Sequence, residues 1–142
     1  MFIKMIGASI AVIGALSLLQ AQNAPTIKKV PAKNTSAASG KEMFVEYCAA
    51  CHGSDGAGKG PAATALKKAP ADLTQLTAKN NGTFPEMHVY RYIQGEDEVA
   101  AHGSRDMPVW GSVFGTMHQH DNDLTQMRLA NLTSYIQSLQ KK

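Results

Sequence analysis

The sequence predicts an all-α domain built from three main helices and a few shorter helical turns. Segments near residues 40–50, 85–94 and 123–139 place apolar side chains at the spacing of one helix face. Residues typical of helix ends flank these segments, and no stretch alternates apolar and polar residues as a half-buried strand does. A chain of 142 residues is long enough for one domain with its own core and too short for two ordinary ones.

The first helix is expected from about Gly40 to Ala50. Ser39 and Glu42 stand three residues apart, as in a capping box, where each side chain accepts a backbone N–H that the helix leaves free. The apolar stripe of this helix comprises Met43, Phe44, Tyr47 and Cys51.

The second main helix is expected to start at Thr83, Pro85 and Glu86 and to end at Gly95, because these residue types favour helix starts and ends. Its apolar stripe comprises Met87, Tyr90 and Ile93. Shorter helical turns are expected at residues 62–66 and 72–76.

The last helix is expected to begin near Asp123. Lys141 and Lys142 lie at the chain end, where positive charge suits the C-terminal dipole of a helix. The side chains expected on its buried face are Leu124, Leu129, Leu132, Tyr135, Ile136 and Leu139.

Residues 1–21 have the features of a secretory signal peptide. Lys4 precedes an uncharged apolar run from Ile6 to Leu19, and the small residue Ala21 offers a cleavage position. The run is short for a transmembrane helix, which needs roughly 18 or more apolar residues. The expected location is periplasmic or otherwise extracytoplasmic. The alternative is an uncleaved anchor that holds the domain at the outer face of a membrane, and only this alternative involves the membrane.

Residues 22–38 are expected to form a disordered tether ahead of a domain at 39–142. The segment contains Pro25 and Pro31 with several lysines and small polar residues, and it offers little apolar surface to offset the entropy of ordering. Cleavage after Ala21 would remove one base and no acid, so the formal net charge would fall from +3 to +2. This charge is too small to indicate nucleic-acid binding.

Residues 48–52 read Cys-Ala-Ala-Cys-His, and C-x-x-C-H is the attachment signature of c-type haem. The thiols of Cys48 and Cys51 add to the two vinyl groups of haem as thioethers. The two-residue spacing lets one short turn place both sulfurs along one edge of the porphyrin. His52 then lies under the ring and gives an imidazole nitrogen to the iron. The sequence therefore predicts one covalently bound haem c.

Other interpretations of the cysteine pair have less support. A zinc site would need two more Cys or His ligands at suitable spacing, and the chain has only these two cysteines. A thioredoxin-like redox pair would follow a strand and begin a helix, whereas here the pair is expected to end one. A structural disulfide is the remaining alternative for an exported chain.

The glycine-rich stretch Gly53–Pro61 partly resembles a phosphate-binding loop. Gly60, however, stands where the Ser or Thr that binds Mg²⁺ should be, and no strand is expected before the loop. The glycines are more consistent with tight backbone turns at a haem edge.

Met107 is the preferred candidate for the second axial ligand. Met and His both serve as axial ligands in electron-transfer haems. Met107 precedes Pro108, which stiffens the segment, so a loop can hold the thioether at the iron. His102 is the main rival, and an open site or another Met is also considered. Met87 and Met127 are interpreted as core residues of helices, His88 as solvated, and His118 and His120 as loop residues of unassigned role.

The ordered combination of these motifs resembles a class I cytochrome c of the small monohaem bacterial kind, from about Ser39 to Gln140. The resemblance implies the cytochrome c-like fold around one haem. It implies that Gly40 and Phe44 meet Leu132 and Tyr135 where the first and last helices cross. It also implies that the Pro61 carbonyl accepts a hydrogen bond from the second imidazole nitrogen of His52, and that Trp110 packs near a haem propionate.

The function expected from these observations is one-electron transfer in an extracytoplasmic chain, by a monomer that is not itself an enzyme. The expected partners are redox proteins, and the basic side chains Lys59, Lys67, Lys68, Lys79 and Arg105 either form a docking rim or are ordinary solvated charges. One alternative is an electron-accepting subunit of a dehydrogenase or oxidase complex. Another is a peroxidase or gas sensor, which would require an open iron site.

Overall fold

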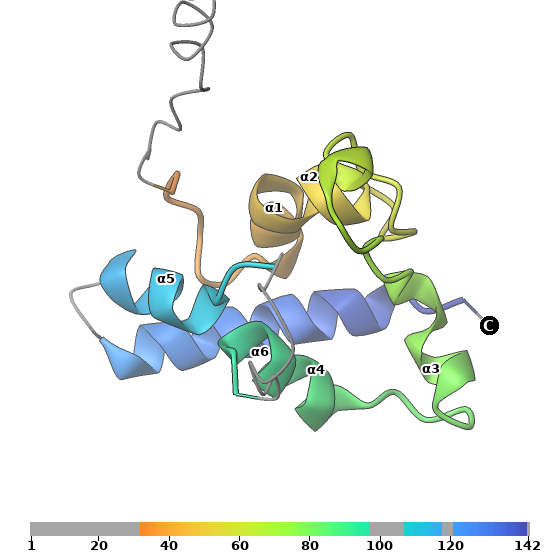
Figure 1. The fold of residues 1–142 in the computed structure, drawn as a ribbon. Helices are drawn as coiled ribbons and strands as arrows, with labels where there is room; N and C mark the ends of the chain where they lie inside the picture. Colours follow the sequence, from red (N-terminus) through yellow and green to blue (C-terminus); the bar gives the residue numbers. More distant parts are fainter. Residues whose placement is uncertain (1–31, 97–106, 118–120, 142) are drawn as a thin grey trace, which may run out of the picture. The chain divides into compact units, whose positions relative to one another are not determined.

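A computed structural model describes residues 32–96, 107–117 and 121–141. All regular elements in these ranges are helical, as the sequence predicts (Figure 1). The α-helices are α1 (Gly40–Met43), α2 (Ala49–His52), α3 (Leu76–Lys79), α4 (Glu86–Gln94), α5 (Trp110–Met117) and α6 (Asn122–Ser138). The remaining elements are a π-helix, η2 (Phe44–Cys48), and two short 3₁₀ turns, η3 (Ala63–Ala65) and η4 (Leu73–Gln75).

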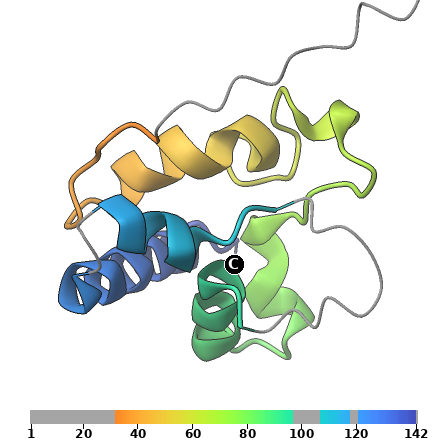
Figure 2. The ribbon, with the colours of Figure 1, turned by 60° about the vertical axis from the view of Figure 1, so that its left-hand side comes forward.

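Helix α6 is the element around which the others pack. Helices α1, α4 and α5 all contact it, and Figure 2 shows the short helix α5 beside it, while the run from α1 to α2 crosses it at an angle. Apolar side chains from α1, η2, α4, α5 and α6 meet in one buried core: Met43, Phe44, Cys48, Val89, Ile93, Phe114, Leu129, Leu132 and Ile136.

The crossing of α1 and α6 depends on Gly40. A Cβ atom at this position would lie 2.1 Å from the carbonyl oxygen of Asn131 and 2.8 Å from Cβ of Tyr135. The aromatic rings of Phe44 and Tyr135 pack one turn further on, with centroids 5.3 Å apart. The close approach predicted for Gly40 and Phe44 at this crossing is therefore confirmed.

The first helical run is continuous from Gly40 to His52, but its middle is a π-helix. Ser39 caps its start, because its Oγ accepts the N–H of Glu42 at 3.2 Å. The reciprocal half of the predicted capping box is absent, since the Glu42 carboxylate accepts the N–H of Ser36 at 3.3 Å. A π segment inside an α-helix is uncommon and often lies at a functional site; here it ends at Cys48.

Helices α4 and α6 have nearly the predicted ends. Gly95 ends α4 in a left-handed conformation with φ of 101°, and Asp121 caps α6 by accepting the N–H of Leu124 at 3.1 Å. The predicted stripe of α4 is partly wrong, because Val89 is buried with Ile93 while Met87 is 63% exposed.

Helix α5 is not among the predicted elements. The sequence predicts a loop around Met107 between the helices on either side, but residues 110–117 form a regular helix. Trp110 and Phe114 lie one turn apart, with ring centroids 5.8 Å apart, and Phe114 is fully buried. Burial of these rings stabilises a segment that contains two glycines and has weak intrinsic helix propensity.

Residues 32–38 are ordered, which corrects the prediction of a disordered tether over residues 22–38 for this part of the segment. The compact unit begins at Ala32, and Thr35 within this segment is buried. The guanidinium of Arg128 donates to Oγ1 of Thr35 at 2.9 Å and to its carbonyl oxygen at 2.6 Å. Hydrogen bonds, rather than apolar burial, therefore order this part of the segment, which composition does not reveal. Residues 22–31 lie outside the described ranges, as does the predicted signal peptide at 1–21.

None of the helices that the structure describes is long and apolar enough to cross a membrane.

Candidate functional site

The C-x-x-C-H motif lies at the end of the first helical run. Cys48 ends the π-helix, and Cys51 and His52 belong to the short helix α2. Cys48 is buried in the core, whereas Cys51 is half-buried, and both are free thiols. The disulfide alternative is therefore not formed in this structure. Burial, with a smaller contribution from the negative charge of Cys51, raises the pKa of the Cys48 thiol to about 12.

The loop that follows the motif satisfies the last carbonyl groups of the helix. A helix leaves its final carbonyls without intrahelical partners. Here the N–H of Gly53 donates to the carbonyl of Ala49 at 2.9 Å, and that of Ala62 donates to the carbonyl of Ala50 at 2.8 Å. The N–H of Gly60 donates to the carbonyl of Cys51 at 3.0 Å, and that of Gly58 donates to the carbonyl of His52 at 2.7 Å. The loop thus folds back over the motif and fixes its backbone.

Two consequences follow from this return of the loop. Gly60 tolerates no side chain, because a Cβ atom there would lie 2.4 Å from the carbonyl oxygen of Ala50. The N–H groups of Gly58 and Gly60 are also engaged with the helix, so they are not free to hold a phosphate. This geometry agrees with the interpretation of the loop as a turn at the motif rather than a nucleotide site.

His52 has one ring nitrogen engaged. Its Nδ1 lies 3.0 Å from the carbonyl oxygen of Ala71, and since a carbonyl only accepts, Nδ1 carries the proton in this arrangement. Burial lowers the pKa of His52, although the bond to Ala71 acts in the opposite direction. Burial favours a neutral imidazole, and the bond from Nδ1 to Ala71 leaves the Nε2 lone pair free to bind a metal.

The acceptor differs from the one that the family resemblance implies. Pro61 was expected to receive this hydrogen bond, but Pro61 is exposed and the acceptor is Ala71. The reason lies in the loop, whose residues on either side of Pro61 bond to the carbonyls of Ala50 and Cys51. The segment before η4 therefore approaches His52 instead.

Met107 differs from the other methionines after the motif in lying outside the described helices. It is half-buried, lies just before α5 outside any helix, and packs against the apolar core. Met87 and Met127, interpreted from the sequence as core residues, are 63% and 41% exposed. Met117 is half-buried at the end of α5, with its sulfur 3.9 Å from the hydroxyl of Tyr47.

An aromatic cluster joins the motif helix to α5. Tyr47 immediately precedes Cys48, and its ring centroid lies 5.2 Å from that of Trp110 and 5.6 Å from that of Phe114. Trp110 opens α5 three residues after Met107. The cluster therefore links the residues before the thiols to the segment that carries Met107.

Several predicted site residues fall outside the described residues. These are the rival ligand His102, the loop residues His118 and His120, and Arg105 of the basic rim. Within the described ranges, no three His, Cys, Asp or Glu side chains converge in a way that could hold a metal ion.

Sequence reasoning missed Ala71, Thr35 and Arg128. Arg128 is 1% exposed and lies with its guanidinium carbon 5.7 Å from the ring centroid of Phe114. One signal was available, because Arg128 lies four residues before Leu132 on the apolar face of α6. An arginine on such a stripe indicates a buried polar contact.

A family model described as cytochrome C oxidase, cbb3-type, subunit III matches residues 35–136. The chain belongs to this family. The chain is thus a cytochrome c domain, that is, a monohaem c-type cytochrome. The all-α fold class predicted from the sequence is confirmed. No curated protein and no solved structure shows a significant match.

The side chains at the motif fit covalent haem c. Cys48 and Cys51 are free thiols at the required spacing, and His52 keeps Nε2 available because Nδ1 is engaged. Partly buried apolar side chains pack against the core that contains Cys48, among them Leu73, Leu76, Phe84, Tyr90 and Met107.

Proposed function

We propose that this protein carries single electrons through one haem c held by thioether bonds to Cys48 and Cys51. The observation that carries the proposal is the C-x-x-C-H motif of a cytochrome c domain, in which His52 has only its Nε2 free. His52 is the proximal ligand and Met107 the distal one. When bound, the haem supplies an iron that cycles between Fe(II) and Fe(III).

The chain's own residues set the conditions for this exchange. Ala71 holds the His52 ring in one tautomer and orientation, which is how carbonyl partners of ligating imidazoles act. A thioether such as that of Met107 favours Fe(II) and raises the potential. With both axial positions filled, no substrate needs to bind the iron. Trp110 is proposed to offer its indole N–H to a haem propionate.

The protein is proposed to work outside the cytoplasm as a monomer. The support is the sequence of residues 1–21 together with the haem motif, since the described residues do not include this segment. Lys59, Lys67 and Lys68, which follow the motif, are exposed. They are available to an acidic redox partner, although exposed lysines are also common without a docking role.

The test is a set of substitutions at Met107. Met107→Ala should let cyanide, imidazole or carbon monoxide bind readily, because alanine provides no ligand. Met107→His should keep the iron low-spin and lower the potential, because an imidazole stabilises Fe(III) better than a thioether. A fall on the order of 100 mV would correspond to about 2 kcal/mol of differential ligand stabilisation. Redox titration followed by optical spectra gives ligation and potential together.

The exposed methionines provide matched controls for this test. Met87→Ala and Met127→Ala remove the same thioether from positions where the side chain is 63% and 41% exposed, so the potential and ligand binding should stay unchanged. If His102→Ala opened the iron and Met107→Ala did not, the distal ligand would be His102 and the assignment of Met107 would fail.

A second candidate function is favoured by the family itself. The family description names a subunit of a cbb3-type oxidase, so the domain could deliver electrons within such a complex rather than as a free carrier. The haem chemistry would be the same. Mild detergent purification of the native protein decides between them, because stoichiometric recovery with an oxidase would support the subunit and recovery of the domain alone would support the free carrier.

A further inference from the structure

The segment Ala32–Ala38, here called the strap, is held by α6 at two positions, Thr35 and Ala37. Arg128 donates two hydrogen bonds to Thr35, one to the hydroxyl and one to the carbonyl oxygen. Asn131 donates its side-chain N–H to the carbonyl oxygen of Ala37 at 2.9 Å. Arg128 and Thr35 are both buried, and hydrogen bonds from a charged donor in a buried site are among the stronger ones. The strap is therefore fixed to the domain.

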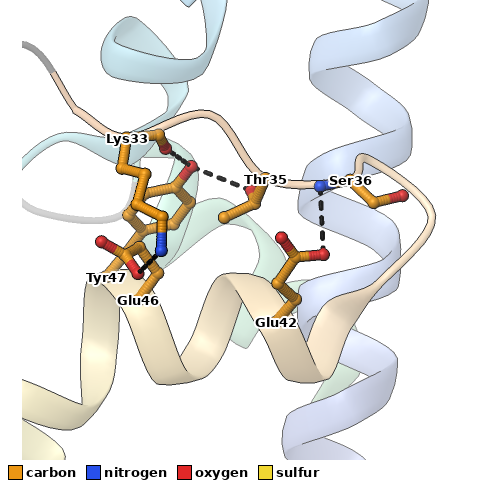
Figure 3. A network of polar contacts seen from close by, with 6 residues as sticks. All are labelled: Lys33, Thr35, Ser36, Glu42, Glu46 and Tyr47. Atoms are coloured by element: carbon orange, nitrogen blue, oxygen red, sulfur yellow. Dashed lines mark hydrogen bonds and ion pairs between the residues drawn. The ribbon is translucent and has the colours of Figure 1, made fainter.

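The strap also contacts the motif helix through Tyr47 (Figure 3). The Tyr47 hydroxyl lies 2.5 Å from the carbonyl oxygen of Lys33 and 2.9 Å from Oγ1 of Thr35. An ion pair between Lys33 and Glu46, with Nζ and Oε2 3.1 Å apart, lies beside these bonds on the exposed side.

Counting protons fixes the direction of this chain of hydrogen bonds. The carbonyl of Lys33 can only accept, so the single proton of the Tyr47 hydroxyl is donated there. The hydroxyl of Thr35 must then donate to Tyr47, and it accepts from Arg128 in turn. The relay thus runs from Arg128 through Thr35 and Tyr47 to Lys33, and the Met117 sulfur, 3.9 Å from the Tyr47 hydroxyl, is a second and more distant acceptor. A relay of this kind holds its members in one arrangement.

The ring of Tyr47 carries this constraint to α5. It packs against Trp110 and Phe114 with centroids 5.2 and 5.6 Å apart. Trp110 is the first residue of α5 and stands three residues after Met107. Arg128 also contacts this helix directly, since its guanidinium lies over the ring of Phe114. The strap and Arg128 therefore fix, through Tyr47, the start of the helix that follows Met107.

We infer that the relay of Arg128, Thr35 and Tyr47 positions the distal-ligand segment at residues 107–110. These are positioning residues, because they act on Met107 through Trp110 and α5. The inference rests on the proposed role of Met107 as a ligand. Its physical basis is that the Met107 thioether binds the iron only while residues 107–110 keep a fixed position. Each hydrogen bond lost from the relay makes it easier for this segment to move and for the thioether to leave the iron.

The experiment compares haem-loaded full-length variants in the ferric state. Thr35→Val removes the hydroxyl that links Arg128 to Tyr47 at nearly constant volume, and Tyr47→Phe removes the other hydroxyl while keeping the ring. Each should raise the rate of cyanide binding by about threefold to tenfold, the factor that corresponds to one net hydrogen bond. Each should also speed hydrogen exchange in peptides that cover residues 107–117. Because both variants break one relay, their effects should not add in the double variant.

Matched controls separate positioning from general stability. Asn131→Ala breaks the other attachment of the strap, at Ala37, without touching the relay, so it should lower the free energy of unfolding but leave cyanide binding unchanged. Thr35→Ser retains a hydroxyl and should restore the behaviour of the unmodified protein. If Thr35→Val and Tyr47→Phe lower stability but leave both cyanide binding and exchange in 107–117 unchanged, the relay is only structural and the inference is wrong.

Failure of the proposed function would give a different result. If Met107 is not a ligand, the unmodified protein lacks the optical signature of Met-ligated ferric haem. Met107→Ala then binds cyanide no faster than the unmodified protein. If instead Met107 is a ligand but the relay does not position it, the unmodified protein shows that signature and Met107→Ala binds cyanide faster. The relay variants then bind cyanide no faster than the unmodified protein. The first result overturns the ligand assignment, and the second overturns the positioning role alone.

Discussion

Replacing Gly40 with alanine tests the close approach of helices α1 and α6. The added Cβ would lie 2.1 Å from the carbonyl oxygen of Asn131, whereas carbon and oxygen atoms of neighbouring helices approach to about 3.3–3.6 Å. The partner atom is backbone, so no side-chain rotation relieves the overlap. Helices α1 and α6 would have to separate by roughly 1 Å, and a gap of that size forfeits a quarter to a half of the dispersion energy of the side chains across it.

The expected loss of stability follows from two opposing terms. Overpacking of this kind costs about 1–3 kcal/mol and occasionally more, and the absence of any soft neighbour at Gly40 places it at the upper end. Alanine regains somewhat less than 1 kcal/mol of helix propensity at this first helical position. The net destabilisation should be about 2 kcal/mol, which would lower the midpoint of thermal unfolding by roughly 10 °C in a domain of this size.

Gly115 provides the control for this measurement. It lies inside helix α5, and none of the described heavy atoms lies within 4 Å of a Cβ built there. Gly115→Ala should therefore raise stability by about 0.5–1 kcal/mol, the usual gain in a helix interior. Denaturant unfolding followed by far-ultraviolet circular dichroism compares the two. If Gly40→Ala stabilised the protein as Gly115→Ala does, the close crossing of α1 and α6 would be refuted.

Two further predictions concern buried and charged polar groups. The Thr133 hydroxyl is buried without a hydrogen-bond partner among the described residues; Thr133→Val should therefore increase the free energy of unfolding by about 1 kcal/mol, and an unchanged or lower urea midpoint would indicate a partner. The pKa of Asp72 is lowered chiefly by its hydrogen bonds from the hydroxyl and N–H of Thr74. A lowered folded-state pKa gives stability that is present above the unfolded-state value of about 4 and is lost as the pH falls through the folded-state value. The stability difference between the unmodified protein and Asp72→Asn should therefore shrink below about pH 4, and a pH-independent difference would contradict this role.

The sequence predicted the parts of the molecule that depend on neighbouring residues. The C-x-x-C-H motif, the end of α4 at Gly95 and the start of α6 next to Asp123 are local patterns, and the structure has both helix ends within about one residue of the expected positions. The approach of Gly40 to α6 was also expected, but from the family resemblance rather than from any local signal.

Contacts between distant residues account for what the sequence analysis missed. Helix α5 is stabilised by rings that pack against Tyr47, which lies more than sixty residues earlier, and its own sequence has weak helix propensity. The strap was predicted to be disordered because it has little apolar surface. Its order comes from Arg128, which is separated from Thr35 by 93 positions. The composition of a segment indicates how much apolar surface it can bury. It does not indicate which hydrogen-bond donors from distant parts of the chain contact the segment.

The two sides of the proposed haem site also differ in whether local or distant contacts support them. On the proximal side, Cys48, Cys51 and His52 lie within five consecutive residues, and the loop to Ala62 satisfies their helix by hydrogen bonds to its last carbonyls. The proposed distal ligand, Met107, has no comparable local support, because it depends on α5 and hence on the packing of Tyr47, Trp110 and Phe114. Segments held by few and distant contacts open at lower free energy than the body of a domain. The covalent side of the site is therefore expected to survive perturbations that release the thioether, and the strap, though far from Met107 in sequence, is expected to affect the ligation of the iron.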